Sequence, residues 1–148
     1  VGMLNRIFSA FDEPLAELGL TKIKTIGDAY MVAAGVPEEM PDHAKNLIVF
    51  AKHMLSVVRE FPGIQLRIGI ASGSLIGGVI GRSRQVFDVW GEVVNMASLI
   101  ESTGVVGRVQ VSEATYQWVR DDFQFHRRET QLTTRVGDPV VVYLLEDT

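Results

Sequence analysis

The stretch from Lys22 to Val36 restricts the fold of this chain more than any other part of it. A β-branched run ends at Ile26, the dipeptide Gly27-Asp28 is a two-residue turn signal, and an extended apolar run resumes at Tyr30. This order of residues is typical of a β-hairpin. The sequence therefore predicts a hairpin whose turn presents the carboxylate of Asp28.

Lys24 lies in the first strand of this hairpin, so a cation stands near the turn carboxylate of Asp28. Two interpretations are open at this point. An aspartate at a turn commonly hydrogen-bonds its own backbone, and a lysine on a strand is commonly solvated. The same two groups also suit a metal–nucleotide site. A second segment, far downstream, bears on the choice.

Composition limits the classes of partner. The chain has 148 residues, of which 47% are hydrophobic and 22% charged, as expected for one compact domain with a sizeable core. The net charge is −4, so the chain lacks the excess of positive charge that is typical of nucleic-acid-binding proteins, and no nucleic-acid partner is expected. A small phosphate ligand needs only local positive groups and stays possible.

Cysteine is absent, which excludes disulfides and thiolate metal sites and fits a cytoplasmic location. The longest apolar stretches, such as 47–51, are far too short to span a bilayer. We expect a cytoplasmic chain without direct membrane contact of its own, while the parent protein's attachment to a membrane is left open.

Hydrophobic periodicity and turn signals predict the order of elements. The expected helices are 3–18, one that begins after Asp42, 93–102, and 113–120 with Ser112 as its N-cap; the expected strands are the hairpin, 65–71, 75–80, 109–111, 123–127 and 140–145. Strands 65–71 and 75–80 are expected to join through a Ser-Gly-Ser turn. This order predicts an α+β fold with helices over one face of a mainly antiparallel sheet.

Four linked motifs carry a family resemblance. KIKTIGDAYM is followed by RIGIASG with GGVIG, then by FDVWGEVVNMAS and ESTG, over most of residues 20–104. In this order and at these separations they resemble the catalytic domain of the class III nucleotidyl cyclases, of the adenylate cyclase type. The resemblance implies a single domain over 1–148 with a ferredoxin-like βαββαβ core and C-terminal additions. The family's first strand would lie before Val1, which makes the chain N-terminally incomplete.

The implied reaction converts ATP to 3′,5′-cyclic AMP and pyrophosphate with two divalent ions, Mg or Mn, per site. In the family two aspartates hold these ions, and Asp28 matches the one at the hairpin turn. The other belongs to a strand motif that this sequence does not contain. We therefore expect the 148 residues by themselves not to turn over.

The resemblance also assigns base selection. Lys24 and Asp88 match the family's purine-recognition pair, where adenylate-specific members carry Lys and Asp and guanylate-specific members carry Glu and Cys. A lysine donates to the N1 acceptor of adenine, and an aspartate accepts from its 6-amino group. ATP is the expected nucleotide.

Three further positions concern the transition state. Asn95 matches the family asparagine that orients the ribose, and Arg135 corresponds loosely to a lysine that holds the terminal phosphates. Four residues after Asn95 the family has an arginine, but this chain has Leu99. Loss of such a donor lowers the rate by about a hundredfold or more. Candidate replacement cations are Arg82, Arg84 and Arg108.

Because the family's metal carboxylates and purine pair come from different subunits, the resemblance implies a head-to-tail homodimer with two composite sites. The second interpretation, motivated by Leu99, is a catalytically degenerate module that binds ATP or regulates a partner cyclase.

Overall fold

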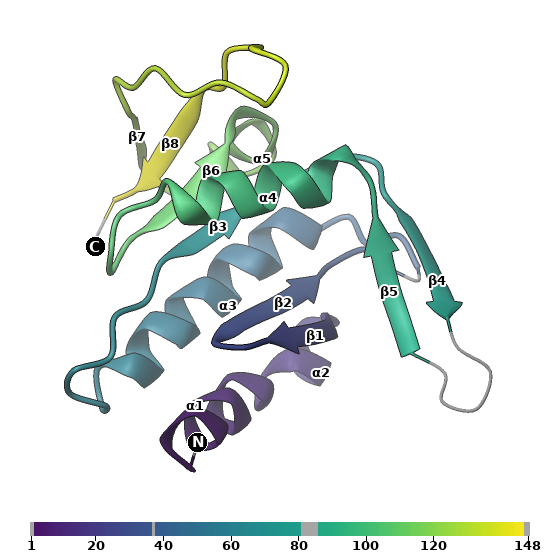
Figure 1. Ribbon diagram of the computed structural model, residues 1–148, viewed down its shortest axis with the longest axis vertical. Helices are drawn as coiled ribbons and strands as arrows, with labels where there is room; N and C mark the ends of the chain where they lie inside the picture. The colour runs from purple at the N-terminus through teal and green to yellow at the C-terminus, as the bar shows by residue number, and fades with distance from the viewer. Residues whose placement is uncertain (1, 37, 81–85, 147–148) are drawn as a thin grey trace. The chain divides into compact units, whose positions relative to one another are not determined.

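The computed structural model describes residues 2–36, 38–80 and 86–146. The chain forms two compact units, one made of residues 1–64 and 76–90 and the other of residues 65–75 and 91–148. Each unit combines helices with strands (Figure 1). The predicted α+β class is therefore confirmed.

The first unit contains two antiparallel hairpins, β1–β2 and β4–β5, together with three helices. Its elements are α1 (Gly2–Asp12), α2 (Leu15–Leu18), β1 (Thr21–Ile26), β2 (Ala29–Ala33), α3 (His43–Val58), β4 (Ile76–Ile80) and β5 (Val86–Trp90). The predicted hairpin turn forms as expected: Ile26 pairs with Ala29, and Gly27 between them has a φ of 59°. Glycine adopts this left-handed conformation without steric penalty.

The single helix expected over 3–18 is wrong, since the structure has two helices there. α1 ends at Asp12, and Pro14 holds the N-cap position of α2. Proline lacks an N–H and its ring clashes with the preceding turn, so the helix cannot continue through it. α2 then ends at Gly19, whose φ of 68° closes its last turn.

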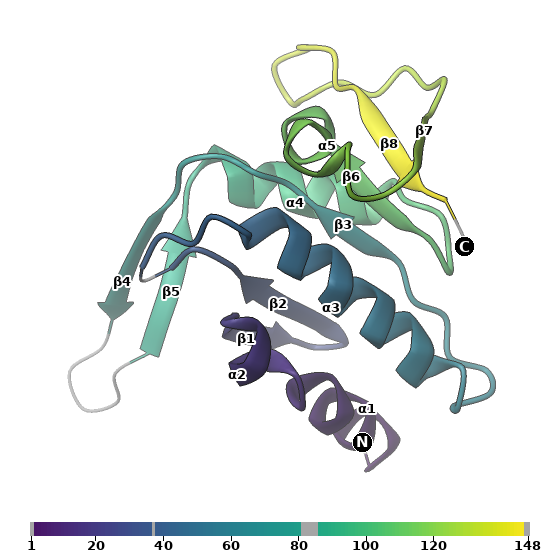
Figure 2. The ribbon, with the colours of Figure 1, turned by 180° about the vertical axis from the view of Figure 1, so that it is seen from behind.

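The second unit is built on a four-stranded sheet. Its elements are β3 (Ile68–Ile70), α4 (Glu92–Ser102), β6 (Val109–Ser112), α5 (Glu113–Val119), β7 (Phe125–Arg127) and β8 (Val142–Leu145). The strand order is β3-β6-β8-β7; β3 and β6 run parallel and the other neighbours antiparallel. α4 covers β3 and β6, in front of them in Figure 1 and behind them in Figure 2.

The expected pairing of strands 65–71 and 75–80 is also wrong. β3 pairs with β6, and β4 pairs with β5, a strand that the sequence did not predict. A turn signal fixes only the local chain direction, whereas strand neighbours depend on burial of both faces. Ile68 and Ile70 are buried on one face of β3, and Gly69 between them lies against α4 on the other. The described strands therefore form three separate sheets, still mainly antiparallel.

α4 lies unusually close to β3 because of Gly69. A Cβ built on this glycine would lie 2.3 Å from the backbone nitrogen of Glu101 and 2.7 Å from its Cα. No side chain fits in that space. The close approach sets the position of α4, whose buried residue Ile100 packs with Val140 and Val142.

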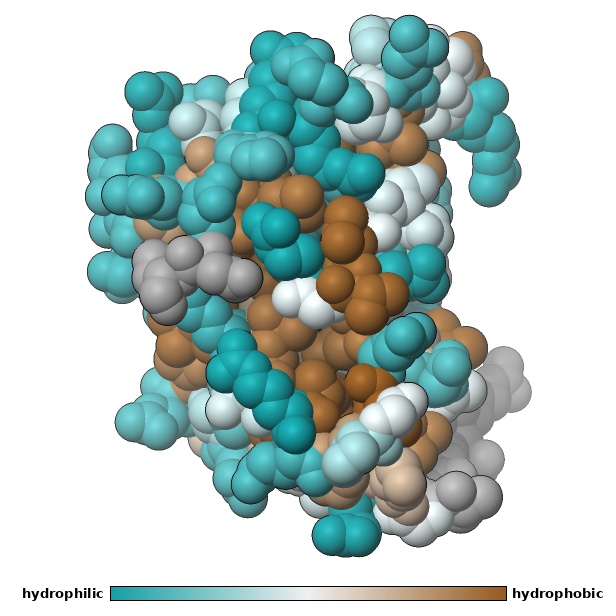
Figure 3. Space-filling model, turned by 90° about the vertical axis from the view of Figure 1, so that its left-hand side faces the viewer, coloured by the Kyte–Doolittle hydropathy of each residue, from teal (hydrophilic) through white to brown (hydrophobic). Residues whose placement is uncertain are grey.

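The surface is mixed in character. Figure 3 shows one face on which apolar side chains are uncovered among hydrophilic ones. On the β4–β5 hairpin, Ile76 and Trp90 are 69% and 42% exposed. Across residues 2–36, 38–80 and 86–146, we find no helix with the length and apolar character needed to cross a membrane.

Gly69→Ala tests the close approach. We expect a loss of about 1–3 kcal/mol in the free energy of unfolding, because the new methyl group meets backbone atoms that cannot move aside. Gly73→Ala is the matched control, since its Cβ would lie 3.4 Å from the Val93 side chain, an ordinary contact. Urea unfolding of both variants measures the difference, and equal stability would contradict the packing described.

Candidate functional site

Lys24 and Asp88 form an ion pair in the first unit. Lys24 lies on β1 and Asp88 on β5, 64 residues further along the chain, and the Lys24 Nζ donates to Asp88 Oδ2 at 2.8 Å. The side chains are 37% and 13% exposed, respectively. The two residues expected to select the base are thus brought into contact, at a place that solvent still reaches.

The environment keeps Asp88 ionised. The hydrogen bond from Lys24 holds the pKa of this carboxyl below its ordinary value, and the backbone N–H of Val89, 2.8 Å from Asp88 Oδ1, adds to the effect. Asp88 is therefore an acceptor only, while a lysine ammonium is a donor only. The pair presents one donor and one acceptor side by side.

Asp28 lies exposed at the β1–β2 turn. Its carboxylate oxygens are the hard ligands that Mg²⁺ prefers, and Mg²⁺ is often held by one or two carboxylates together with substrate phosphates. Asp28 fits as one such ligand. Nowhere in the described ranges do three His, Cys, Asp or Glu side chains gather closely enough to hold a metal ion.

Asn95, Leu99 and Arg135 line one pocket of about 510 Å³ in the second unit. Asn95 and Leu99 are one turn apart on α4, and Arg135 comes from the loop before β8. The remaining lining residues are Glu92, Met96, Thr133, Thr134, Val136 and Asp138. The two threonines and Asp138 were not predicted as lining residues, although their place beside Arg135 in TTRVGDP is a signal for them.

A tight hairpin presents Arg135. The N–H of Thr134 donates to the Asp138 carbonyl at 2.8 Å, and the N–H of Gly137 donates to the Thr134 carbonyl at 2.9 Å. Gly137 has a φ of 92°, the left-handed conformation that follows a type I turn in a three-residue hairpin loop. Arg135 thus occupies the tip of a well-defined turn and is exposed.

The Leu99 side chain packs against the buried cluster of Ile100, Val140 and Val142. Among the candidate replacement cations, Arg108 donates to the Leu145 carbonyl at 2.9 Å and serves the fold. Arg82 and Arg84 lie outside the described residues. The cation that lines the Leu99 pocket is Arg135.

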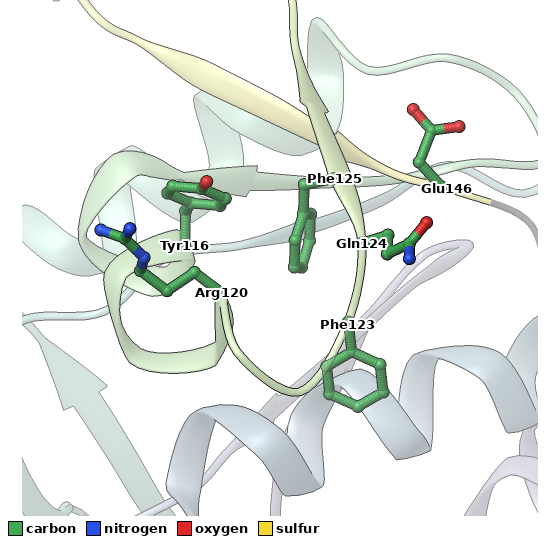
Figure 4. Close-up of a pocket in the computed structure, with 6 residues that line it drawn as sticks. All are labelled: Tyr116, Arg120, Phe123, Gln124, Phe125 and Glu146. Carbon is green, nitrogen blue, oxygen red and sulfur yellow. The ribbon is translucent and has the colours of Figure 1, made fainter.

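A second hollow of about 490 Å³ lies beside α5 (Figure 4). Tyr116 and Arg120 come from α5 and the residue after it, and Glu146 from the end of β8; Phe123, Gln124 and Phe125 complete the lining. The Tyr116 ring stacks on Tyr143 with centroids 3.9 Å apart. None of the predicted site residues lies here.

Comparison with known proteins identifies the family. The adenylate and guanylate cyclase catalytic domain matches residues 1–147, so the chain belongs to this family. It is 44% identical over 133 residues to an adenylate cyclase of Mycobacterium tuberculosis, covering 86% of this chain but 30% of that protein. The chain therefore spans under a third of that relative's length.

Solved structures with the same fold include domains bound to different nucleotides. The guanylate cyclase domain of RhGC from Catenaria anguillulae in complex with GTP has a TM-score of 0.90 and 30% identity, covering 97% of this chain and 81% of that one. The catalytic core of a rhodopsin-guanylyl cyclase with converted specificity, in complex with ATPαS, has a TM-score of 0.89 and 32% identity, covering 96% and 79%. The ferredoxin-like fold is thereby confirmed.

Lys24→Met tests the electrostatics of the pair. We expect the pKa of Asp88 to rise toward its ordinary value, measured by NMR titration of its carboxyl carbon. Because the native pKa is lowered, the carboxylate stabilises the wild-type fold at neutral pH, and this contribution is lost as the pH falls through the native pKa. In Lys24→Met this contribution of Asp88 to the stability of the fold, and its loss at low pH, are absent. Arg67→Met, at the surface pair with Glu101, is the control and leaves Asp88 unchanged.

Proposed function

We propose that this domain is an adenylate cyclase that converts ATP to 3′,5′-cyclic AMP and pyrophosphate. The observation that carries the proposal is the contact between Lys24 and Asp88. Family membership supports cyclase chemistry in general, and the pair supports adenine over guanine.

The pair matches the edge of adenine. A lysine ammonium has three N–H groups, so Lys24 can donate to Asp88 and also to the adenine N1. Asp88 keeps free lone pairs for the 6-amino group, since a carboxylate accepts at both oxygens. Guanine carries an N1–H and a 6-oxo group instead. Its donor would face the lysine and its acceptor the aspartate, and GTP is disfavoured on both counts.

In the reaction the ribose 3′-oxygen attacks the α-phosphorus, the hydroxyl proton leaves, and the bond to the pyrophosphate oxygen breaks. Asn95 holds the ribose through its amide, and Arg135 neutralises charge on the phosphates. Asp28 would hold Mg²⁺ or Mn²⁺ together with phosphate oxygens. When bound, such ions lower the pKa of the hydroxyl and offset the charge on the leaving group.

A head-to-tail homodimer completes the proposal. Asp28 is one ligand of a set that needs more carboxylate, and it lies on the same hairpin as Lys24. We infer that Asp28 serves the nucleotide whose adenine is held by the partner's copy of the purine pair. The exposed Ile76 and Trp90 on the β4–β5 hairpin supply apolar surface for such an interface.

The double variant Lys24→Glu, Asp88→Cys tests the substrate. We expect the ratio of kcat/KM for ATP to that for GTP to fall by about tenfold to a hundredfold in the intact protein, because charged hydrogen bonds to adenine are lost. Cyclic AMP and cyclic GMP are quantified with Mg²⁺ or Mn²⁺ present.

The matched control for this double variant is Arg67→Glu, Glu101→Cys, which makes the same kind of change at a surface ion pair of 3.3 Å. It should leave the ATP to GTP ratio unaltered. An unchanged ratio in the Lys24, Asp88 variant would refute the purine-pair assignment.

A second candidate function rests on Leu99. Position 99 carries a leucine, packed against the buried cluster and lining the same pocket as Asn95, so the domain lacks the arginine donor of its family there. A degenerate module that binds ATP or regulates a partner cyclase would have the same feature. The two functions predict different responses to a restored arginine.

Leu99→Arg separates the two functions. For an impaired enzyme we expect cyclic AMP formation to rise by about a hundredfold, because a donor aimed at the phosphates is worth that much. A regulatory module would form no cyclic AMP with either residue. Leu99→Met is the control, since it keeps an apolar side chain of similar volume.

A further inference from the structure

β1 contains one residue more than its partner strand requires. Lys22 pairs with Val32 and Lys24 pairs with Met31, so Ile23 between the lysines has no partner in β2. Residues directly opposite in an antiparallel pair point to the same face, and consecutive residues point to opposite faces. Since Met31 and Val32 are consecutive, the bulge places Lys22 and Lys24 on opposite faces of the hairpin. In a regular strand they would share one face.

The Lys22 face of the hairpin meets the end of α1. The Lys22 Nζ lies 3.2 Å from both carboxylate oxygens of Asp12, the last residue of that helix. The Tyr30 hydroxyl donates to Asp12 Oδ1 at 2.6 Å, and Lys22 lies over the Tyr30 ring at 5.2 Å. Asp12 therefore binds both strands of the hairpin.

Aromatic packing holds Tyr30 in place beside Asp12. Its ring centroid lies 5.4 Å from those of Phe8 and Phe11 on α1 and 6.1 Å from that of Phe50 on α3. Held among these rings, the Tyr30 hydroxyl donates to Asp12 Oδ1 at 2.6 Å. The lysine ammonium and the tyrosine hydroxyl then share one carboxylate.

We propose that Asp12, Tyr30 and the bulge at Ile23 are positioning elements that aim Lys24 at Asp88. Asp12 holds Lys22 and Tyr30 on the α1 face. Ile23 is the extra residue between the lysines, and its burial fixes the position of the bulge. A one-residue shift of register would turn Lys24 away from β5. The consequence for base selectivity rests on the proposed function, whereas the aiming of Lys24 does not.

Asp12→Ala tests the aiming directly, through the NMR titration of the Asp88 carboxyl. Loss of the Asp12 contacts frees Lys24 from its orientation, and we expect the pKa of Asp88 to rise, as in Lys24→Met. Removal of a negative charge at a distance acts in the opposite direction and lowers a carboxyl pKa. The sign of the change therefore separates repositioning from plain electrostatics. Glu13→Ala, which removes the exposed neighbouring carboxylate, is the control and should not raise it.

Tyr30→Phe is the second variant, chosen because it changes no charge and keeps the ring contacts. It should also raise the pKa of Asp88. In both variants we expect the ATP to GTP ratio of kcat/KM to fall by about threefold to tenfold, in keeping with one weakened hydrogen bond. Melting temperatures identify which variants are folded.

The proposal is overturned if folded Asp12→Ala or folded Tyr30→Phe leaves the pKa of Asp88 at its wild-type value. The titration needs neither nucleotide nor turnover. An intact wild-type protein, with all of its parent chain, that forms no cyclic AMP would refute the proposed function and leave this measurement valid.

Discussion

The ion pair between Lys24 and Asp88 joins two strands that belong to different sheets. Solvent still reaches this pair, so it contributes little to stability, and its importance lies in orientation rather than in holding the fold together. The hydrogen bond from Lys24 keeps Asp88 ionised by lowering the pKa of its carboxyl. The result is a donor and an acceptor in fixed order, which is what discrimination between two purine edges requires.

This pair depends in turn on one extra residue. The bulge at Ile23 sends Lys22 toward α1 and Lys24 toward β5, and Asp12 holds the first of these directions. β-Bulges re-aim side chains next to functional sites in many proteins. Here the same device links a helix end to the residues proposed to read the base, without any change to the turn that presents Asp28.

Elements governed by local chemistry were predictable. The Gly27-Asp28 turn and the N-cap of α5, where Ser112 accepts from the Thr115 N–H, need only neighbouring residues. Elements governed by distant partners were not. β5 was not predicted from the sequence, because so short a strand is defined by its pairing with β4 and not by its own hydrophobic periodicity. One helix was also predicted across Pro14, because the apolar spacing continues on both sides of it. Proline breaks a helix at such a position, and this local signal should have been given more weight.

The sequence by itself determined the family, the hairpin and the chemical types at the candidate site: a lysine and an aspartate that we propose read the base, a turn carboxylate, and a leucine in place of an arginine. Only the tertiary structure decided which of these meet. Lys24 reaches Asp88 across 64 residues, and Arg135 lines the pocket of Leu99. Side-chain direction depends on register and packing, and a single unpaired residue such as Ile23 reverses it while leaving the alternation of residue types unchanged.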